Sequence, residues 1–142
     1  MTDQAIHSVS VAGIVLNQAG QVLVVQRRDN GHWEPPGGIL ERDETFEAGV
    51  VREVAEETGV AVQVERLTGV YKNMRRSVVA IVYLCRAVGG SAHVTSESRA
   101  TRWIAPDEVP ALMEPAYAVR VADALTPVGV ASRSHDGRAG VQ

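Results

Sequence analysis

Three glutamates, Glu53, Glu56 and Glu57, are spaced so that a single helix would carry all of them on one side. A helix turns by about 100° per residue, so neighbours at i, i+3 and i+4 fall within roughly 100° of arc. Like charges at this spacing repel one another by about 0.3 kcal/mol per pair, which gives a purely structural helix no reason to gather them. A hard divalent cation with oxygen ligands would convert this repulsion into binding. The spacing therefore predicts a metal site.

Clustered carboxylates around Mg²⁺, with Mn²⁺ as a substitute, suit one class of reaction. Hydrolysis of a diphosphate needs neutralised phosphate charge, an attacking oxygen held in line, and a water made nucleophilic near neutral pH. Without metal, we expect at least one of the three glutamates to hold a proton more tightly than an isolated glutamate, because the charges are crowded. Metal binding should then strengthen as the pH rises.

The helix that positions these glutamates is predicted over residues 45–58. Thr45 can cap its first turn, and Gly59 can adopt the left-handed conformation that ends it. Projection at 100° per residue gives a buried stripe of Phe46, Val50, Val51, Val54 and Ala55. The same projection places Glu53 and Glu57 beside that stripe, so these carboxylates should be partly shielded from water.

The rest of the pattern predicts a sheet with helices on both faces, an α/β (α+β) class. Strands are expected over 9–16, 22–25, 60–70, 78–88 and 100–104, a helical turn over 106–109, and a covering helix over 115–125. The covering helix should bury Tyr117, Val121 and Leu125. Between the second strand and the glutamate helix, Pro35-Pro36-Gly37-Gly38 is expected to prevent regular structure.

Composition bounds the organisation and the partners. With 142 residues, of which 45% are hydrophobic, we expect one domain over residues 1–126 and a mobile tail over 127–142, where small and polar residues replace the apolar period. A formal net charge of −3 argues against binding duplex nucleic acid and leaves a nucleotide-sized ligand open. The single cysteine and four scattered histidines favour an oxygen-bound metal over zinc.

Localisation follows from what the chain lacks. The start, MTDQAIHS, has no basic and apolar regions of a signal peptide, and the longest apolar run, 78–85, has the length of a strand. We therefore expect a cytoplasmic protein without a membrane partner.

The segment from Gly38 to Val60 resembles the Nudix hydrolase signature at every defined position. It reads Gly38, five residues, Glu44, seven residues, Arg52-Glu53-Val54, one residue, Glu56-Glu57, one residue, Gly59-Val60. The preceding Trp33-Glu34-Pro35-Pro36-Gly37-Gly38 is similar to the family's lead-in, with Pro35 where leucine is usual. The resemblance extends from near residue 6 to near residue 125 and implies an α/β/α sandwich around a mixed sheet.

The resemblance also implies residue roles. Glu53, Glu56 and Glu57 would hold the divalent metal, and the Gly38 carbonyl would join them; a simple turn is the alternative for Gly38. Arg52 would orient glutamates of the segment such as Glu44. It projects more than 90° from Glu53, so we do not expect it to pair with the ligands along the helix, and a solvated charge is its alternative.

Two assignments lie outside this set. Glu97 is the candidate general base, since in several branches of the family a glutamate from a later loop faces the metal; an ordinary loop residue is the alternative. Gly49 stands inside the helix where alanine is usual, at a cost of about 1 kcal/mol, and either leaves room for a phosphate or second metal or reflects neutral drift.

Substrate specificity should come from residues outside the signature that offer cationic groups and stacking surfaces. The candidates are Arg27, Arg28, Trp33, Tyr71, Arg75 and Arg76, with ordinary surface positions as the alternative. Trp103 is assigned to the core.

The sequence thus predicts metal-dependent hydrolysis of a diphosphate linkage in a nucleoside diphosphate derivative. ADP-ribose, nucleotide sugars, dinucleoside polyphosphates and modified nucleoside triphosphates all stay open. One alternative is a non-catalytic nucleotide-binding or regulatory module that keeps the fold. A second is isomerisation of a diphosphate ester, which lacks its cysteine and glutamate pair because Cys85 lies in an apolar run. The number of metal ions and a homodimer are left open.

Overall fold

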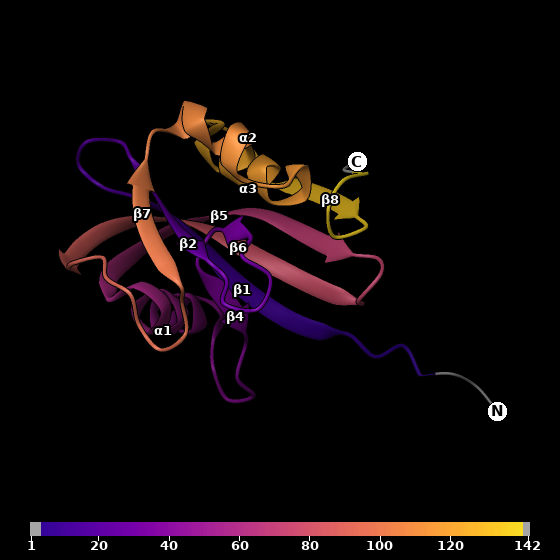
Figure 1. Cartoon of the computed structure of the whole chain (residues 1–142). Coiled ribbons are helices and arrows are strands. Elements are labelled where there is room, and N and C mark those ends of the chain that lie inside the picture. Colours follow the sequence, from indigo (N-terminus) through magenta and orange to yellow (C-terminus); the bar gives the residue numbers. More distant parts are fainter. Residues whose placement is uncertain (1–3, 141–142) are drawn as a thin grey trace.

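The computed structural model describes residues 4–140. In this range one mixed sheet of eight strands has helices on both faces (Figure 1). The strands are β1 (Ser8–Leu16), β2 (Val22–Gln26), β3 (Trp33–Glu34), β4 (Gly37–Ile39), β5 (Val60–Asn73), β6 (Val78–Gly90), β7 (Ala100–Ile104) and β8 (Ala131–His135). The helices are α1 (Phe46–Thr58), a 3-10 turn η1 (Pro106–Glu108), α2 (Val109–Leu112) and α3 (Pro115–Leu125). The predicted fold class is confirmed.

Strand β1 lies at the centre of the sheet. The order is β3-β2-β1-β6-β5-β8, with β4 paired to β1 and β7 paired to β2. The β1–β6 and β5–β8 pairs are parallel, and the other pairs are antiparallel. Because β4 pairs directly with β1, the start of the glutamate-rich segment is tied to the middle of the sheet.

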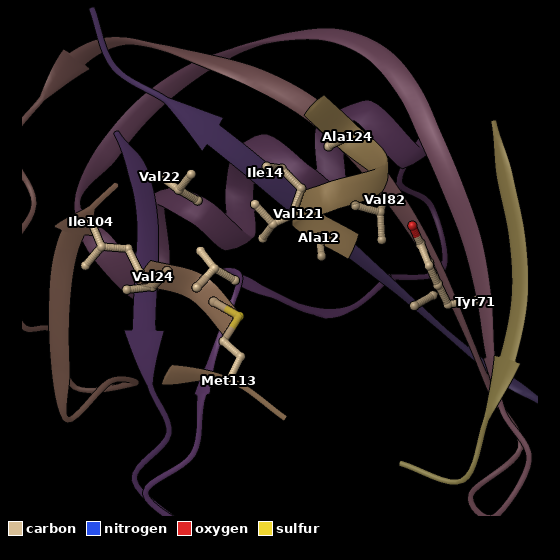
Figure 2. Packing of buried hydrophobic residues seen from close by; sticks show 12 residues of the cluster. Ala12, Ile14, Val22, Val24, Tyr71, Val82, Ile104, Met113, Val121 and Ala124 are labelled. Atoms are coloured by element: carbon tan, nitrogen blue, oxygen red, sulfur yellow. The ribbon is translucent and has the colours of Figure 1, made fainter. Parts of the chain in front are cut away.

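Alternating side chains of β1 build two separate cores. Val11 and Val15 face the α1 side of the sheet, whereas Ala12 and Ile14 face the α2 and α3 side. Figure 2 shows the second core, in which Val121 and Ala124 of α3 lie over these β1 residues. α1 and α3 therefore cover opposite faces of the sheet.

Helix α1 begins and ends where its sequence predicts. The Thr45 side chain accepts a hydrogen bond from the Ala48 N–H at 3.2 Å, and Gly59 closes the helix with φ 79°.

The buried face of α1 differs from the predicted stripe. Val50 and Val54 are fully buried, but Phe46 and Val51 are 44% and 40% exposed, and Ala55 is exposed as well. The face is rotated toward Gly49 and Glu53, which are buried. The projection missed this rotation because α1 packs on β4 and on the strands beneath it, and glycine lets the helix approach them closely.

Short strands flank the two prolines where irregular structure was expected. β3 pairs with β2, and β4 pairs with β1 through Ala12↔Gly37, Val11↔Gly38 and Ser10↔Ile39. Pro35 and Pro36 lie between these strands, so their missing N–H groups leave both ladders intact. A Cβ at position 37 would overlap the Val11 carbonyl oxygen, so Gly37 is what lets the strand approach β1.

The expectation of a mobile tail over residues 127–142 is corrected. Residues 131–135 form β8, which pairs in parallel with β5 from Gly69↔Ala131 to Asn73↔His135. The strand was missed because Ala-Ser-Arg-Ser-His has no apolar alternation; its contacts are instead an ion pair from Arg133 to Asp123 at 2.8 Å and the buried His135. Residues 141 and 142 lie outside the described part. Over residues 4–140, none of the helices has both the length and the apolar character needed to cross a membrane.

Candidate active site

Carboxylates from two distant parts of the chain converge beside α1. Glu53, Glu56 and Glu97 each offer one oxygen, and these three oxygens lie within 4.8 Å of one another. Glu53 is 8% exposed, whereas Glu56 and Glu97 face solvent. Three carboxylate oxygens at this separation, open to water on one side, fit a hard divalent cation that keeps water ligands.

The loop that brings in Glu97 is hydrogen-bonded to α1. The Thr95 hydroxyl donates to the Glu57 carbonyl oxygen at 3.3 Å and accepts from the Glu97 N–H at 3.1 Å. Arg28 donates from Nη2 to the Thr95 carbonyl oxygen at 3.3 Å. Arg28, predicted as a substrate contact, thus supports the loop that carries Glu97.

Glu57, the third predicted ligand, is not one of these three carboxylates and contacts β4. Its Oε1 accepts a hydrogen bond from the Gly37 N–H at 2.7 Å. Burial raises the pKa of Glu57 to about 8, against the opposing effect of that hydrogen bond. Burial likewise raises the pKa of Glu53, while Arg52 opposes the rise. The direction agrees with the sequence prediction, but the main cause is burial and not crowding of like charges.

At Gly38 and Gly49, neighbouring side chains leave no room for a Cβ. A Cβ at position 38 would lie 2.5 Å from Glu53 Oε2, so only glycine lets this carboxylate rest against the β4 backbone. A Cβ at position 49 would lie 2.7 Å from Leu40 Cδ1 and 2.9 Å from Glu44 Oε1. The space beside Gly49 is thus filled by protein, and the hypothesis that it holds a phosphate or second metal is wrong.

Arg52 links the carboxylates of the site to one another. It donates to both oxygens of Glu44, from Nε at 2.6 Å and from Nη2 at 2.8 Å. Its Nη1 donates to Glu53 at 2.8 Å and to Glu56 at 3.1 Å. The expectation that Arg52 would not pair with the ligands along the helix was wrong, because its long side chain bends across the angle that separates it from Glu53. Hydrogen bonds from Arg52 lower the pKa of Glu44 to about 2.

A cleft of about 740 Å³ adjoins the carboxylates at Gly37 and Gly38 and extends to α3. Its lining is positive: five arginines against two carboxylates. These are Arg27, Arg75, Arg76, Arg120 and Arg138, and Glu34 and Asp136. A smaller hollow of about 240 Å³ lies between β7 and α2, around Ile104 and Leu112, and its lining has one arginine and one carboxylate. The large cleft is therefore the place for a polyanionic ligand.

Only some of the predicted substrate contacts line this cleft. Arg27, Arg75 and Arg76 line it. Trp33 packs against the core, with the Arg102 guanidinium 5.6 Å from its ring centre. Tyr71 is fully buried and donates from its hydroxyl to Asp123 at 2.7 Å, so its assignment as a substrate contact is corrected. Trp103 packs against the α1-side core, in agreement with its assignment.

Sequence reasoning missed Arg120 and Tyr117, which reach the cleft from α3. The sequence contained a clue to Arg120. It follows Tyr117 by three positions and directly precedes Val121, so a charged residue lies on the predicted buried face of that helix. The observed buried face comprises Ala116, Arg120, Val121 and Ala124, whereas Leu125 is 38% exposed.

Cys85 offers no alternative chemistry. It is 1% exposed, and burial raises the pKa of its thiol to about 12. A thiol that holds its proton this tightly in an apolar core cannot protonate a substrate double bond, which argues against isomerisation.

Comparisons with known proteins agree with this geometry. The model of the NUDIX domain matches residues 6–124. A MutT-like protein of Streptomyces ambofaciens is 53% identical over 137 residues, 96% of this chain and 89% of that protein. A Bacillus subtilis relative, provisionally named an 8-oxo-dGTP diphosphatase, is 33% identical over 72% of this chain and 69% of its own length. The crystal structure of an ADP-ribose pyrophosphatase from Streptococcus suis superposes with TM-score 0.75 and 25% identity, over 92% of this chain and 100% of that one. The chain therefore belongs to the Nudix hydrolase family and is a pyrophosphohydrolase, an enzyme that acts on phosphoric anhydride bonds.

Proposed function

We propose that this protein hydrolyses the diphosphate linkage of a nucleoside diphosphate derivative with the help of Mg²⁺ or Mn²⁺. The observation that supports the proposal most directly is the group of Glu53, Glu56 and Glu97 beside an arginine-rich cleft, since Glu53 lies against Gly38 and Gly38 lines that cleft. Carboxylates alone would repel a diphosphate, whereas carboxylates that hold a divalent cation next to arginines attract one.

Glu53, Glu56 and Glu57 would hold the metal, with the Gly38 carbonyl beside them. When bound, the cation neutralises phosphate charge and lowers the pKa of a coordinated water. In the reaction a water oxygen forms a bond to one phosphorus while the bridging P–O bond breaks, and a nucleoside monophosphate and a phosphorylated remainder leave. Glu97 lies among the clustered oxygens and is the candidate that accepts the proton of the water.

Arg27, Arg75 and Arg76 bind and orient the phosphates in this proposal. Arg75 and Arg76 follow β5. The Asn73 side-chain oxygen accepts hydrogen bonds from the backbone N–H of Arg75 at 3.0 Å and from that of Arg76 at 3.2 Å. Arg27 donates two hydrogen bonds to Asp29, its side chain is 43% exposed, and it lines the cleft. The relatives supply two substrate candidates, ADP-ribose and 8-oxo-dGTP, and we place this chain's substrate in the wider class that contains both.

The test is product analysis with a panel of nucleoside diphosphate derivatives, with Mg²⁺ or with Mn²⁺. ADP-ribose, a nucleotide sugar, a dinucleoside polyphosphate and 8-oxo-dGTP should be compared for the native protein and Glu57→Gln. We expect metal-dependent release of a nucleoside monophosphate, reduced at least about 100-fold in the variant. Metal binding without turnover of any panel member would contradict the proposal and favour a binding or regulatory module.

A further inference from the structure

Arg120 of α3 is a buried cation that reaches the cleft. It is 7% exposed, yet its side chain forms part of the cleft wall. Over residues 4–140, no carboxylate comes within ion-pairing distance of its guanidinium, and its buried Nε has no hydrogen-bond partner. Buried arginines are normally paired, so this one needs a physical reason.

The Arg120 guanidinium lies over the rings of two tyrosines. The Arg120 Cζ lies 4.9 Å from the ring centre of Tyr71 and 4.7 Å from that of Tyr117. Contacts of this kind stabilise a cation, but they supply no acceptors for its N–H groups.

His135 supplies at most one weak acceptor. Arg120 Nη2 lies 3.3 Å from His135 Nε2, while the Gly137 N–H donates to His135 Nδ1 at 2.9 Å. A neutral imidazole accepts at only one of its two nitrogens, so only one of these contacts can be a hydrogen bond. The shorter contact is the one to Gly137. Burial and the Arg120 charge lower the pKa of His135, so the ring is kept neutral and does not balance the charge of Arg120.

An unpaired guanidinium in this position opposes folding. Burial lowers the pKa of Arg120 against the opposing effect of the Glu34 carboxylate, which lines the same cleft without forming an ion pair with Arg120, so the charged form is disfavoured there. Replacement of a buried charge by an apolar side chain of similar volume is often neutral or stabilising, so packing gives no reason to place an arginine here. A ligand that brings an anion into the cleft does, because it supplies both the missing charge and the missing acceptors.

Arg120 and the clustered carboxylates belong to different faces of the sheet, and this separation indicates which part of a ligand reaches Arg120. α3 and α1 cover opposite faces of the sheet (Figure 1), and the cleft lining includes Arg120 of α3 and Gly38, against which Glu53 of α1 lies. The scissile diphosphate belongs at the α1 end, next to the carboxylates. Arg120 therefore meets the other end of the ligand.

We propose that Arg120, set between Tyr71 and Tyr117, forms a second anion subsite that binds a phosphate or carboxylate at the end of the substrate remote from the hydrolysed diphosphate. The source of the anion rests on the proposed function; the subsite itself does not. A free phosphate ion would offer the same chemistry, and the experiment separates these two sources.

The first arm measures the melting temperature of the whole protein in EDTA, with inorganic phosphate at constant ionic strength. EDTA keeps the carboxylates free of metal, so they repel phosphate and do not bind it. At ten times its Kd, bound phosphate should raise the melting temperature by about 4 °C. In Arg120→Met this shift should be lost, and in Arg86→Met, which removes an exposed arginine paired with Glu65, it should remain.

The same arm can overturn the subsite. No shift in the native protein, or an equal shift in Arg120→Met, contradicts it. If Arg120→Met fails to fold, Arg120→Lys serves in its place, because it keeps the charge and loses the planar fork. This variant should lose at least about half of the shift, and an undiminished shift contradicts the proposal.

The second arm compares ligands that differ by one remote anion, by binding in EDTA and without turnover. NADPH carries a 2′-phosphate that NADH lacks, and UDP-glucuronate carries a carboxylate that UDP-glucose lacks. For at least one pair, the native protein should bind the more anionic member about tenfold more tightly, and Arg120→Met should abolish the difference. A phosphate shift at Arg120 without such a difference would overturn the substrate assignment and identify a free anion as the ligand. Because neither arm uses hydrolysis, failure of the proposed function and failure of this inference are separable.

Discussion

Arg52 donates two hydrogen bonds to Glu44, at 2.6 and 2.8 Å, and so fixes both oxygens of this carboxylate just before α1 begins. The same guanidinium reaches Glu53 and Glu56. We therefore propose that Arg52 is a positioning residue, which orients two carboxylates of the cluster without belonging to the cluster itself.

Arg52→Gln should lower metal affinity or kcat by about 10- to 100-fold and leave the fold intact, because groups that orient metal ligands typically contribute this much. Measurement of Mn²⁺ affinity together with hydrolysis rates checks it. Glu41→Gln is the matched control, since Glu41 lies 3.6 Å from Arg52 and its side chain is 67% exposed. Native Mn²⁺ affinity and turnover in Arg52→Gln would contradict the positioning role.

Gly38→Ala should reduce activity by at least about tenfold, because the new Cβ would stand 2.5 Å from Glu53 Oε2 and push this carboxylate off its position. Gly89→Ala is the control, since its Cβ would meet Ala61 at an ordinary 3.7 Å. Steady-state kinetics and melting temperatures of both variants decide the matter. Equal activity of the two would show that Glu53 needs no contact with the β4 backbone.

Glu97→Gln should lower kcat by about 100-fold or more, as expected for loss of a general base or a metal ligand. A pH–rate profile separates the roles: loss of a base removes the acidic limb, whereas loss of a ligand weakens Mn²⁺ binding at every pH. Glu65→Gln provides the control, on the exposed part of β5. Unchanged turnover and unchanged Mn²⁺ affinity in Glu97→Gln would return Glu97 to an ordinary loop position.

The lowered pKa of Asp123 leads to a prediction about how the free energy of unfolding changes with pH. Burial alone would raise its pKa, but hydrogen bonds from Arg133 and Tyr71 outweigh this and lower it below the usual 3.8. A carboxyl group with a lowered pKa in the folded state stabilises the protein above pH 3.8, and this contribution is lost as the pH falls through the folded-state value. Asp123→Asn should cost about 2 kcal/mol at pH 7.

Urea unfolding of both proteins between pH 7 and pH 2 provides the measurement. The difference in unfolding free energy between native protein and Asp123→Asn should shrink toward low pH. A difference that stays constant down to pH 2 would show that the Asp123 charge does not contribute.

Cys85 should resist thiol reagents in the folded protein, because it is buried and burial raises its pKa to about 12. Its labelling rate should follow global unfolding as urea is added. Rapid labelling in native buffer would show that the core around β6 opens locally.

Local rules located the elements of this fold well. Thr45 and Gly59 mark the ends of α1, because cap geometry depends only on the neighbouring backbone. The strands β1 and β6 were predicted because they pair with each other inside the sheet and therefore consist largely of apolar residues. The same rules failed for β8, whose residues are held by partners far away in the sequence. Arg133 needs Asp123, and no periodicity in a five-residue polar stretch reveals that pairing.

The site divides in the same way. A spacing along one helix identified Glu53 and Glu56, and family resemblance pointed to Glu97, which lies more than forty residues after Glu53 in the chain. Arg120 was missed because its role comes from the opposite face of the sheet, which only the three-dimensional structure brings to the cleft.

Strand β8 also forms one edge of the sheet. β5 would otherwise present a long row of free N–H and C=O groups, a template on which another chain could add a strand and begin aggregation. β8 covers part of that row, from Gly69 to Asn73, and becomes the new border there. Its own outward residues are polar and charged, with Ser132 exposed and Arg133 beside it, a composition that discourages further strand addition. The four polar residues of β8 thus give the sheet a border that is unfavourable for pairing with a further strand.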